Sequence, residues 1–415
     1  MSPNIHPTTS GTPAAGAIGL VRTPAVADLS RFALVMIGMT CAVCVANNYY
    51  GQPLLVNIAQ DLGIPRGLSG LAPTLTQIGI ALGMFFILPL GDRIDNRHIT
   101  TSLLLVQSAA LATMAATTIP SLYLATGLVT GLCGIVTYML PAYATRLVPP
   151  ERRGAVTGLL ATGTLTGIML GRSMAGIIGY AIGWRSVYAC AALATFAMAI
   201  VMKRTMPATP NLREDDYAAL MRSQLRLFAT TPLLRRATLL QALSFGSFNA
   251  LWVGLALLLQ DAPFHLDTRQ IGMLALVAVA AAIAAPKLGR LVDRHSVRWT
   301  TILGFGTTAL GWIALLAMPS GYPGVVIGMV AVSIGALTTD IAPRAALYGL
   351  APDIRMRLNA FYSTGTFAGG AALSLATPLI WTNFGWTAIA VVALAINVAG
   401  ACLARSGLPG QVACR

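Results

Sequence analysis

The chain has 415 residues, of which 56% are hydrophobic and only 10% are charged, and its mean hydropathy is +0.73. Soluble domains carry about 25% charged residues, so this composition excludes a water-soluble globular enzyme and predicts a membrane protein that crosses the bilayer many times. The net charge of +14 would indicate nucleic-acid binding in a soluble protein. Here no basic run is interleaved with aromatic residues, and we expect no nucleic-acid partner.

Twelve apolar segments are long enough to cross a bilayer, whose hydrocarbon core of about 30 Å needs roughly 20 apolar residues per helix. The predicted fold class is therefore an all-α membrane protein with twelve transmembrane helices in two pseudo-symmetric six-helix bundles. The predicted spans are residues 32–55, 68–90, 99–118, 122–147, 155–178, 186–202, 237–259, 271–288, 299–318, 325–348, 359–380 and 386–403.

Polar segments divide the chain into parts. The first 30 residues are rich in Pro, Thr, Ser, Gly and Ala and contain no apolar stretch typical of a signal peptide, so we expect a disordered cytoplasmic tail. The longest polar stretch separates span six from span seven. The predicted organisation is a tail (1–30), an N-terminal six-helix bundle (31–203), a central cytoplasmic loop (204–236), a C-terminal six-helix bundle (237–404) and a second cytoplasmic tail (405–415).

The basic residues predict the orientation in the membrane. If the N-terminus is cytosolic, 23 of the 27 Lys and Arg residues lie in inside segments, and only Arg66, Arg185 and Arg269 lie in outside loops. Cytoplasmic loops of membrane proteins carry such an excess. We therefore expect a multi-pass protein of the bacterial inner membrane, with both termini in the cytoplasm and membrane lipid as its surroundings.

The two halves of the chain resemble each other at an offset of roughly 200 residues. Pro141 corresponds to Pro343, the pair Gly183-Trp184 corresponds to Gly385-Trp386, and Asn47 corresponds to Asn249. Parallel six-helix repeats of this kind are one plan for transporters, whose substrate site lies between the halves near the middle of the membrane.

These features resemble the major facilitator superfamily over almost the whole chain after residue 30. The loop after span two reads Gly91-Asp92-Arg93-Ile94-Asp95-Asn96-Arg97, and its copy in the second half reads Gly289-Arg290-Leu291-Val292-Asp293-Arg294. Both resemble a loop motif of the family, with His98 and Ser296 in place of its second glycine. Span five (residues 167–176) resembles the family's antiporter motif, with Arg172 in place of Pro. The segment 48–55 is similar to bacterial sugar- and drug-efflux permeases.

The resemblance implies gating roles for the two loops. Gly91, Arg93, Asp95 and Arg97, with Gly289, Arg290, Asp293 and Arg294 in the second half, would form charged networks that hold the halves closed on the cytoplasmic face. The alternative is that these charges are solvated topology signals, because exposed ion pairs contribute only about 0–1 kcal/mol. The recurrence of the Asp in both halves favours the gating network.

Two ionisable residues lie well inside spans, where a charge costs about 2.5–3.5 kcal/mol, so each is a functional candidate. Asp340 is the intramembrane carboxylate and the candidate proton carrier; its alternative role is an ion pair with Arg344 four residues on. Arg172 could bind an anionic or hydroxylated substrate, or it could bond to groups on the facing half. Helical rise puts Arg172 in the outer half and Asp340 in the inner half of the membrane, too far apart for direct contact.

Neutral polar and aromatic residues in the spans suit the lining of a cavity for a sugar or a moderately polar organic compound. About half of them could instead only join helices to one another. Asn47 and Asn249, at matching positions of the two halves, form the pair of first interest. The predicted cavity residues are Asn47, Asn48, Tyr50, Gln52, Gln77, Tyr138, Arg172, Gln241, Asn249 and Trp252.

The sequence contains no phosphate-binding or dinucleotide-binding motif, no clustered His or Cys ligands for a metal, and no nucleophile–base constellation. We expect no catalytic residue, no metal and no cofactor. The predicted function is secondary active transport by alternating access, with proton-coupled efflux of a small organic solute by a monomer. One alternative is import or facilitated passage of an organic anion through Arg172. An alternative of another class is a membrane sensor or scaffold that transports nothing.

Overall fold

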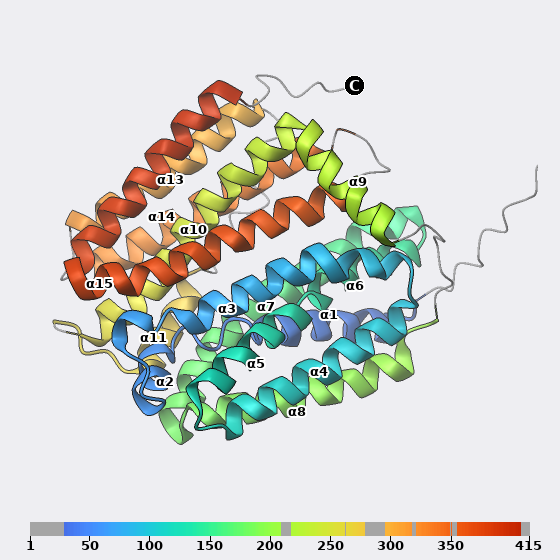
Figure 1. Ribbon diagram of the computed structural model, residues 1–415, viewed down its shortest axis with the longest axis horizontal. Coiled ribbons are helices and arrows are strands. Elements are labelled where there is room, and N and C mark those ends of the chain that lie inside the picture. The colour runs from blue at the N-terminus through green and yellow to red at the C-terminus, as the bar shows by residue number, and fades with distance from the viewer. Residues whose placement is uncertain are drawn as a thin grey trace, which may run out of the picture.

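A computed structural model describes residues 29–208, 217–261, 263–278, 295–317, 321–348, 350 and 355–407. Every regular element in these ranges is helical (Figure 1). The elements are α1 (Arg31–Ala46), α2 (Leu55–Asp61), η1 (Arg66–Leu68), α3 (Leu71–Leu82), η2 (Gly83–Ile87), η3 (Leu88–Asp92), α4 (Asn96–Ala116), α5 (Pro120–Cys133), α6 (Val136–Arg146), α7 (Pro150–Ile182), α8 (Trp184–Thr205), α9 (Tyr217–Thr230), α10 (Pro232–Gln260), α11 (Thr268–Leu274), η4 (Ala275–Ala278), α13 (Val297–Ala317), α14 (Tyr322–Tyr348) and α15 (Arg355–Gly407).

The helices account for the predicted spans. Within the described ranges, nine helical stretches are long and apolar enough to cross a membrane, and Arg31–Ala46 is a shorter apolar helix. One of the nine, Arg357–Ser406, contains two spans, because the backbone of α15 turns back at Gly385. The remaining span, predicted at 271–288, begins with α11 and η4 and continues outside the described residues.

The predicted internal repeat is present in the backbone. Gly183 joins α7 to α8 with φ 87° and ψ 157°, and Gly385 turns α15 with φ 72° and ψ −169°. Side chains other than glycine rarely adopt a positive φ, so glycine suits both turns. Pro141 lies inside α6 and Pro343 lies inside α14 at corresponding places. The two halves therefore share these glycine turns and helix-internal prolines as well as sequence similarity.

The first span is not one continuous helix, contrary to the prediction for residues 32–55. The α-helix ends at Ala46, and turns follow until α2 begins at Leu55. Several backbone bonds in this segment join residues three apart, as in Asn48 N to Val45 O and Gln52 N to Tyr49 O. A proline at position 53 lacks the amide hydrogen that a helix needs. Irregular backbone at membrane depth occurs where it is buried in protein or lines a cavity.

Within the N-terminal half, α7 packs closely on α1 through small residues. A Cβ added to Gly167 would lie 2.3 Å from the carbonyl oxygen of Ala42, and one added to Gly163 would lie 2.7 Å from that of Gly38. Such close approach requires glycine, as in membrane helices that pack through small residues spaced four apart. The glycine face of span five therefore lies directly against the backbone of α1.

The two halves contact each other at the end of the bundle that carries α2 and α11. We call this the outer end, and we call the opposite end, which carries α9, the inner end, following the predicted orientation (Figure 1). The Thr74 hydroxyl donates to the Ala371 carbonyl at 3.2 Å, and the Ser173 hydroxyl donates to the Gly272 carbonyl at 3.0 Å. We call these two contacts the outer seam. At the inner end, the rings of Phe85 and Phe361 meet with centroids 5.4 Å apart.

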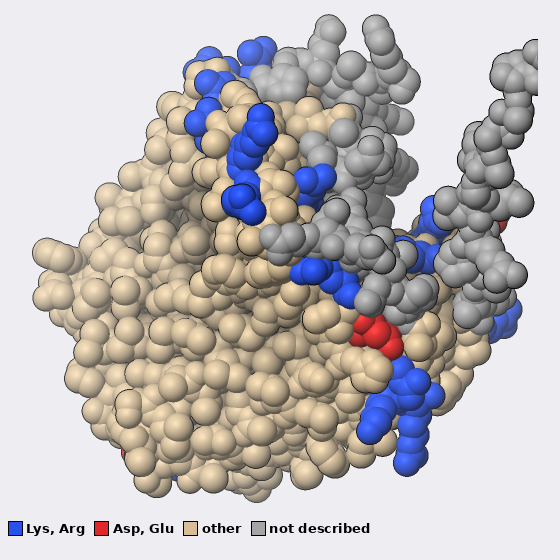
Figure 2. Space-filling view, turned by 45° about the vertical axis from the view of Figure 1, so that its right-hand side comes forward, with Lys and Arg blue, Asp and Glu red and all other residues tan. Residues whose placement is uncertain are grey.

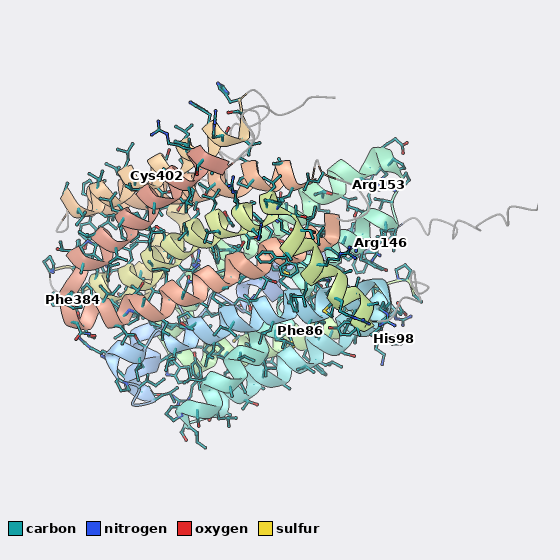
Figure 3. The ribbon with its side chains drawn as sticks, turned by 45° about the horizontal axis from the view of Figure 1, so that its top comes forward. Phe86, His98, Arg146, Arg153, Phe384 and Cys402 are labelled. Atoms are coloured by element: carbon teal, nitrogen blue, oxygen red, sulfur yellow. The ribbon has the colours of Figure 1, made fainter. Side chains whose placement is uncertain are left out.

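Charged side chains are distributed unevenly over the surface. Figure 2 shows Lys and Arg side chains gathered along the upper and right-hand part of the molecule, whereas the broad flank is almost entirely uncharged. In Figure 3, Arg146, Arg153 and His98 lie at one end of the bundle and Phe384 lies at the other. An uncharged flank between charged ends is the surface that a bilayer requires.

An ion pair at the outer end gives a pH-dependent prediction. The Arg185 guanidinium donates to the Asp61 carboxylate, and this bond is the main cause that holds the pKa of Asp61 below its usual value. A lowered carboxyl pKa stabilises the folded state above the pKa of the unfolded chain, and that contribution is lost as the pH falls through the folded-state pKa. Melting curves from neutral pH to about pH 3 should therefore fall less steeply for Asp61→Asn than for the wild type. The effect is expected to be small because both side chains are exposed, and equal slopes would contradict it.

Candidate functional site

A central cavity of about 300 Å³ lies between the two halves. Small-molecule sites in proteins have volumes of roughly 300–1,000 Å³, so the cavity could hold a small organic compound. Residues from the broken first span, α6 and α7 form one side, and residues from α10, α14 and α15 form the other. The lining consists of Tyr49, Tyr138, Leu165, Ile168, Met169, Arg172, Gln241, Phe245, Phe248, Ser333, Ala336, Leu337, Asp340, Arg344, Ser363, Thr366 and Phe367.

Arg172 forms the outer wall of this cavity. Its side chain is only 2% exposed, and its Nε donates to Gln52 Oε1 at 2.8 Å. The guanidinium carbon lies 4.6 Å from the centroid of the Tyr49 ring and 4.1 Å from that of the Trp252 ring. We call these four residues, Arg172, Tyr49, Gln52 and Trp252, the arginine clamp. Tyr49 and Gln52 belong to the broken first span and Trp252 belongs to α10, so the clamp joins the two halves.

Asp340 lies toward the inner end of the same cavity, on α14. Its carboxylate accepts a bond from Arg344 Nη2 at 2.8 Å and one from the Tyr362 hydroxyl at 3.1 Å. Arg344 also donates from Nη1 to Asn359 Oδ1 at 2.9 Å. The side chains of Arg344 and Asp340 are 31% and 27% exposed, so the pair is reachable from the cavity. The ion pair that the sequence offered as the alternative role of Asp340 is present.

The two intramembrane charges occupy opposite ends of one cavity. Arg172 is followed toward the outer end by a small void of about 10 Å³, lined by Leu255 and Leu259 of α10 among others. Asp340 lies one helical turn from Arg344, near the inner end of α14. Their placement in the outer and inner halves agrees with the helical count, and both face the same space.

Six of the other nine predicted cavity residues fall into three groups. Tyr138 and Gln241 line the central cavity. Gln52 and Trp252 belong to the arginine clamp and line the small void on its outer side. Asn47 and Asn48 instead line a separate void of about 20 Å³ inside the N-terminal half.

The remaining three predicted cavity residues, Tyr50, Gln77 and Asn249, also lie outside the central-cavity lining. Tyr50 is not in the cavity lining; it packs beside a hydrophobic cluster of the N-terminal half. Gln77 Nε2 donates to Asn249 Oδ1 at 3.2 Å, which joins α3 to α10 across the halves. Polar side chains of this kind often join helices to one another in membrane proteins, as Gln77 and Asn249 do here.

Asn47 and Asn249, the pair of first interest in the sequence, bond to different helices. Asn47 Nδ2 donates to Thr195 Oγ1 on α8 at 2.9 Å, whereas Asn249 bonds to Gln77. The two asparagines correspond in sequence, but each lies against a different helix. The corresponding contact in the second half joins α10 to α15. There, Asn397 Nδ2 donates to Ser247 Oγ at 2.8 Å.

Sequence reasoning missed Tyr49 and the phenylalanines of the lining, although it included Tyr138 and Trp252. Phe245 and Phe248 line the cavity and Trp252 covers Arg172; their spacing of three and four residues on α10 places them on one face of a helix, which is a readable signal. Phe367 packs edge-on against both Tyr138 and Phe245, with centroids 5.9 Å and 5.4 Å away.

The first gating loop has a local structural role. Asp95 is the N-cap of α4 and accepts from the Arg97 backbone N–H at 3.1 Å. Asn96 Nδ2 donates to the Gly91 carbonyl at 2.8 Å. Side-chain oxygens at an N-cap satisfy free amides of the first turn, so the motif fixes the turn between two spans. The second copy, with Gly289, Arg290, Asp293 and Arg294, lies outside the described residues.

Comparison with known proteins decides the family. A family model described as Major Facilitator Superfamily matches residues 35–261 and 237–410. The chain belongs to the major facilitator superfamily. This major facilitator is a transporter and not an enzyme, as the sequence predicted.

Relatives and solved structures agree with this assignment. The chain is 32% identical over 370 residues to a putative uncharacterized transporter, YgaY, of Escherichia coli K12, with 89% of this chain and 94% of that protein covered. It is 28% identical to a chloramphenicol resistance protein of Streptomyces lividans, with 87% and 94% covered. A bacterial homolog of the human lysosomal transporter Spinster, in an inward-facing and unoccupied conformation, matches with a TM-score of 0.72 and 15% identity, over 90% of this chain and 95% of that one. The predicted fold class is confirmed.

Proposed function

We propose that this major facilitator exports a small organic solute, sugar-like or drug-like, in exchange for protons that enter the cell. The observation that carries the proposal is the central cavity, which has walls from both halves and holds the Asp340–Arg344 ion pair toward its inner end. A cavity between two halves can open to each side in turn if the halves rock against each other.

The outer seam explains how such rocking could be gated. Its two hydrogen bonds, Thr74 to Ala371 and Ser173 to Gly272, join the halves on the outer side of the cavity. Contacts between spans average only about 0.6 kcal/mol each in membrane proteins. A seam of this strength can separate and re-form during transport, while the close glycine packing keeps each half intact.

Asp340 is the group proposed to carry the proton. Protonation would neutralise the carboxylate and remove its ion pair with Arg344, although the hydroxyl of Tyr362 could still bond to the acid. Arg344 would keep its bond to Asn359. Since α14 carries the pair and α15 carries Tyr362 and Asn359, a proton at Asp340 changes the contacts between two helices that line the cavity.

The setting of the proposal is the bacterial inner membrane, with both chain termini and the α9 end in the cytoplasm. The excess of basic residues in the inside segments supports this orientation. The divisions at residues 30, 203, 236 and 404 are kept as the proposed domain boundaries. One chain supplies both walls of the cavity, which supports a monomer as the working unit. The name of the chloramphenicol resistance relative supports export.

The test is transport by the purified protein in liposomes. Vesicles are loaded with radiolabelled chloramphenicol or a monosaccharide, and efflux is followed with and without an acidic exterior. Proton exchange predicts faster efflux when the outside is acidic, and a one-to-one exchange could hold a solute gradient of about tenfold per pH unit. Faster efflux only when the interior of the vesicle is the acidic side would indicate that solute and protons move in the same direction. Failure of every probe to move under either gradient would contradict the proposal and favour the sensor or scaffold alternative.

A further inference from the structure

The arginine clamp holds a positive charge that no carboxylate in the described part of the chain neutralises. Among the residues that the structure describes, no carboxylate lies within 4.0 Å of Arg172. By contrast, Arg344 pairs with Asp340 in the same cavity. Burying a charge is costly unless it is paired, and the cost persists inside a membrane span. The described lining of the cavity therefore has a net positive charge.

Two hydrogen-bond donors in the clamp are also left without partners. Gln52 satisfies Arg172 Nε, but Arg172 Nη2 and Trp252 Nε1 are buried and have no hydrogen-bond partner among the residues that the structure describes. The guanidinium carbon lies 4.1 Å from the Trp252 ring, so the two groups are neighbours. Buried donors are nearly always paired in native proteins, and a carboxylate has the acceptor oxygens to pair with donors of both residues.

The rings of Tyr49 and Trp252 hold the guanidinium in place. Cations over aromatic rings within about 6 Å of the centroid are stabilised, and both distances here are shorter, at 4.6 Å and 4.1 Å. These contacts and the Gln52 bond fix the orientation of the side chain without supplying a negative charge. The clamp is thus an ordered cationic group in the wall of the cavity.

The rest of the cavity suits an apolar body. Phe245, Phe248 and Phe367 line it together with Leu165 and Leu337. A compound that places an anionic group at the outer wall would lay its remaining atoms against these side chains. Sites of this kind combine apolar walls with a few placed polar groups that fix orientation.

We propose that the arginine clamp selects organic anions, and that the solute of this transporter carries a carboxylate or a similar acidic group on an aromatic or apolar body. This inference rests on the proposed function, since it takes the central cavity as the solute site. The acidic group bonds to Arg172 and is near Trp252, and the apolar body contacts the phenylalanines. Because Tyr49 and Trp252 come from different halves, a bound anion contacts both halves at their junction.

The test is equilibrium binding to the purified full-length protein in lipid nanodiscs, by titration calorimetry. The probes are 2-naphthoate and 2-naphthamide, which share the same ring system and differ in charge. The wild type should bind the naphthoate about tenfold more tightly or better, because hydrogen bonds to charged groups are the stronger ones. Arg172→Gln should reduce this preference to near unity while it still binds the amide. Arg172→Lys should restore part of the preference, since it keeps the charge and loses the planar fork.

Two further variants separate the clamp from general effects. Arg185→Gln removes an arginine at the outer surface that pairs with Asp61, and it should leave the preference unchanged. Trp252→Phe keeps a ring and removes the Nε1 donor, and it should weaken naphthoate binding more than amide binding. Retained amide binding in each variant shows that the cavity is intact, and melting curves check folding independently.

Equal affinity of the wild type for the two probes, or a preference that survives in Arg172→Gln, would overturn the inference. Absence of measurable naphthoate binding to the wild type would overturn it as well. Because the binding is measured without any gradient, its outcome is independent of proton exchange. A clear preference for the anion together with failure of gradient-driven efflux would reject proton-coupled export and leave the anion site standing.

Discussion

Replacing Asp340 by Asn should abolish the acceleration of transport by a pH gradient and leave the exchange of labelled for unlabelled solute close to the wild-type rate. Asparagine cannot carry a proton, but its side-chain oxygen can still accept bonds from Arg344 and Tyr362, which now bond to the carboxylate. Gradient-driven efflux from liposomes should fall about tenfold or more, to the rate seen without a gradient, because a variant that binds no proton at residue 340 cannot couple proton entry to solute exit.

The substitution also leaves Arg344 without its anionic partner. Breaking a fully buried ion pair costs about 3–5 kcal/mol, but these two side chains are 31% and 27% exposed, and Arg344 keeps its bond to Asn359. We therefore expect a smaller loss, nearer the 0–1 kcal/mol typical of exposed pairs. The double variant Asp340→Asn with Arg344→Gln removes the unpaired charge. It should recover stability and still fail to respond to the gradient.

Asp61→Asn is the matched control for this experiment. It removes a carboxylate that also pairs with an arginine, but at the outer end and outside the cavity. Gradient acceleration should be unchanged in this variant. Acceleration that persists in Asp340→Asn would remove Asp340 as the proton carrier and assign it a structural role.

Much of this fold could be predicted because the bilayer imposes few solutions. Spans must be long and apolar, and basic residues stay on the cytoplasmic side, so the number of spans follows from hydropathy and charge. The repeat was readable at Gly183 and Gly385, since both sites have backbone angles that side chains other than glycine rarely adopt. The two intramembrane charges also stood out, because such residues are rare and costly.

Pairings between neutral polar groups could not be predicted. Asn47 bonds to Thr195 and Asn249 bonds to Gln77, and nothing in the hydropathy distinguishes these from other partners. A helix that is apolar on all sides does not reveal which face meets its neighbour. The break after Ala46 was missed for a different reason. Residues 47–54 are mostly polar and include Gly51 and Pro53, which are turn signals, but the prediction extended the span across them. The position of Tyr49 beside Arg172 depends on that turn.

Replacing Gly176 by Ala should open the outer end of the transporter. A Cβ at this position would lie 2.4 Å from the Thr268 carbonyl oxygen and 2.9 Å from the Gly272 Cα. Both are backbone atoms of α11 in the other half, so neither can move aside as a flexible side chain would. Overpacking of this kind costs about 1–3 kcal/mol, and α7 and α11 can avoid it only by separating. The outer seam beside it, where Ser173 bonds to Gly272, should then form less often.

The opening can be measured as the reactivity of a buried thiol. Ile271 is 4% exposed and lines the void on the outer side of Arg172, so Ile271→Cys, in a background with the native cysteines replaced by Ser, reports access from the outer side. Gly176→Ala should raise its labelling rate by a membrane-impermeant reagent about tenfold, which corresponds to about 1.4 kcal/mol, and should slow transport. Gly158→Ala, on the same helix, is the matched control, since a Cβ there would meet no atom of the other described elements within 4 Å. Equal labelling rates in the two glycine variants would mean that the contact between α7 and α11 does not close the outer end.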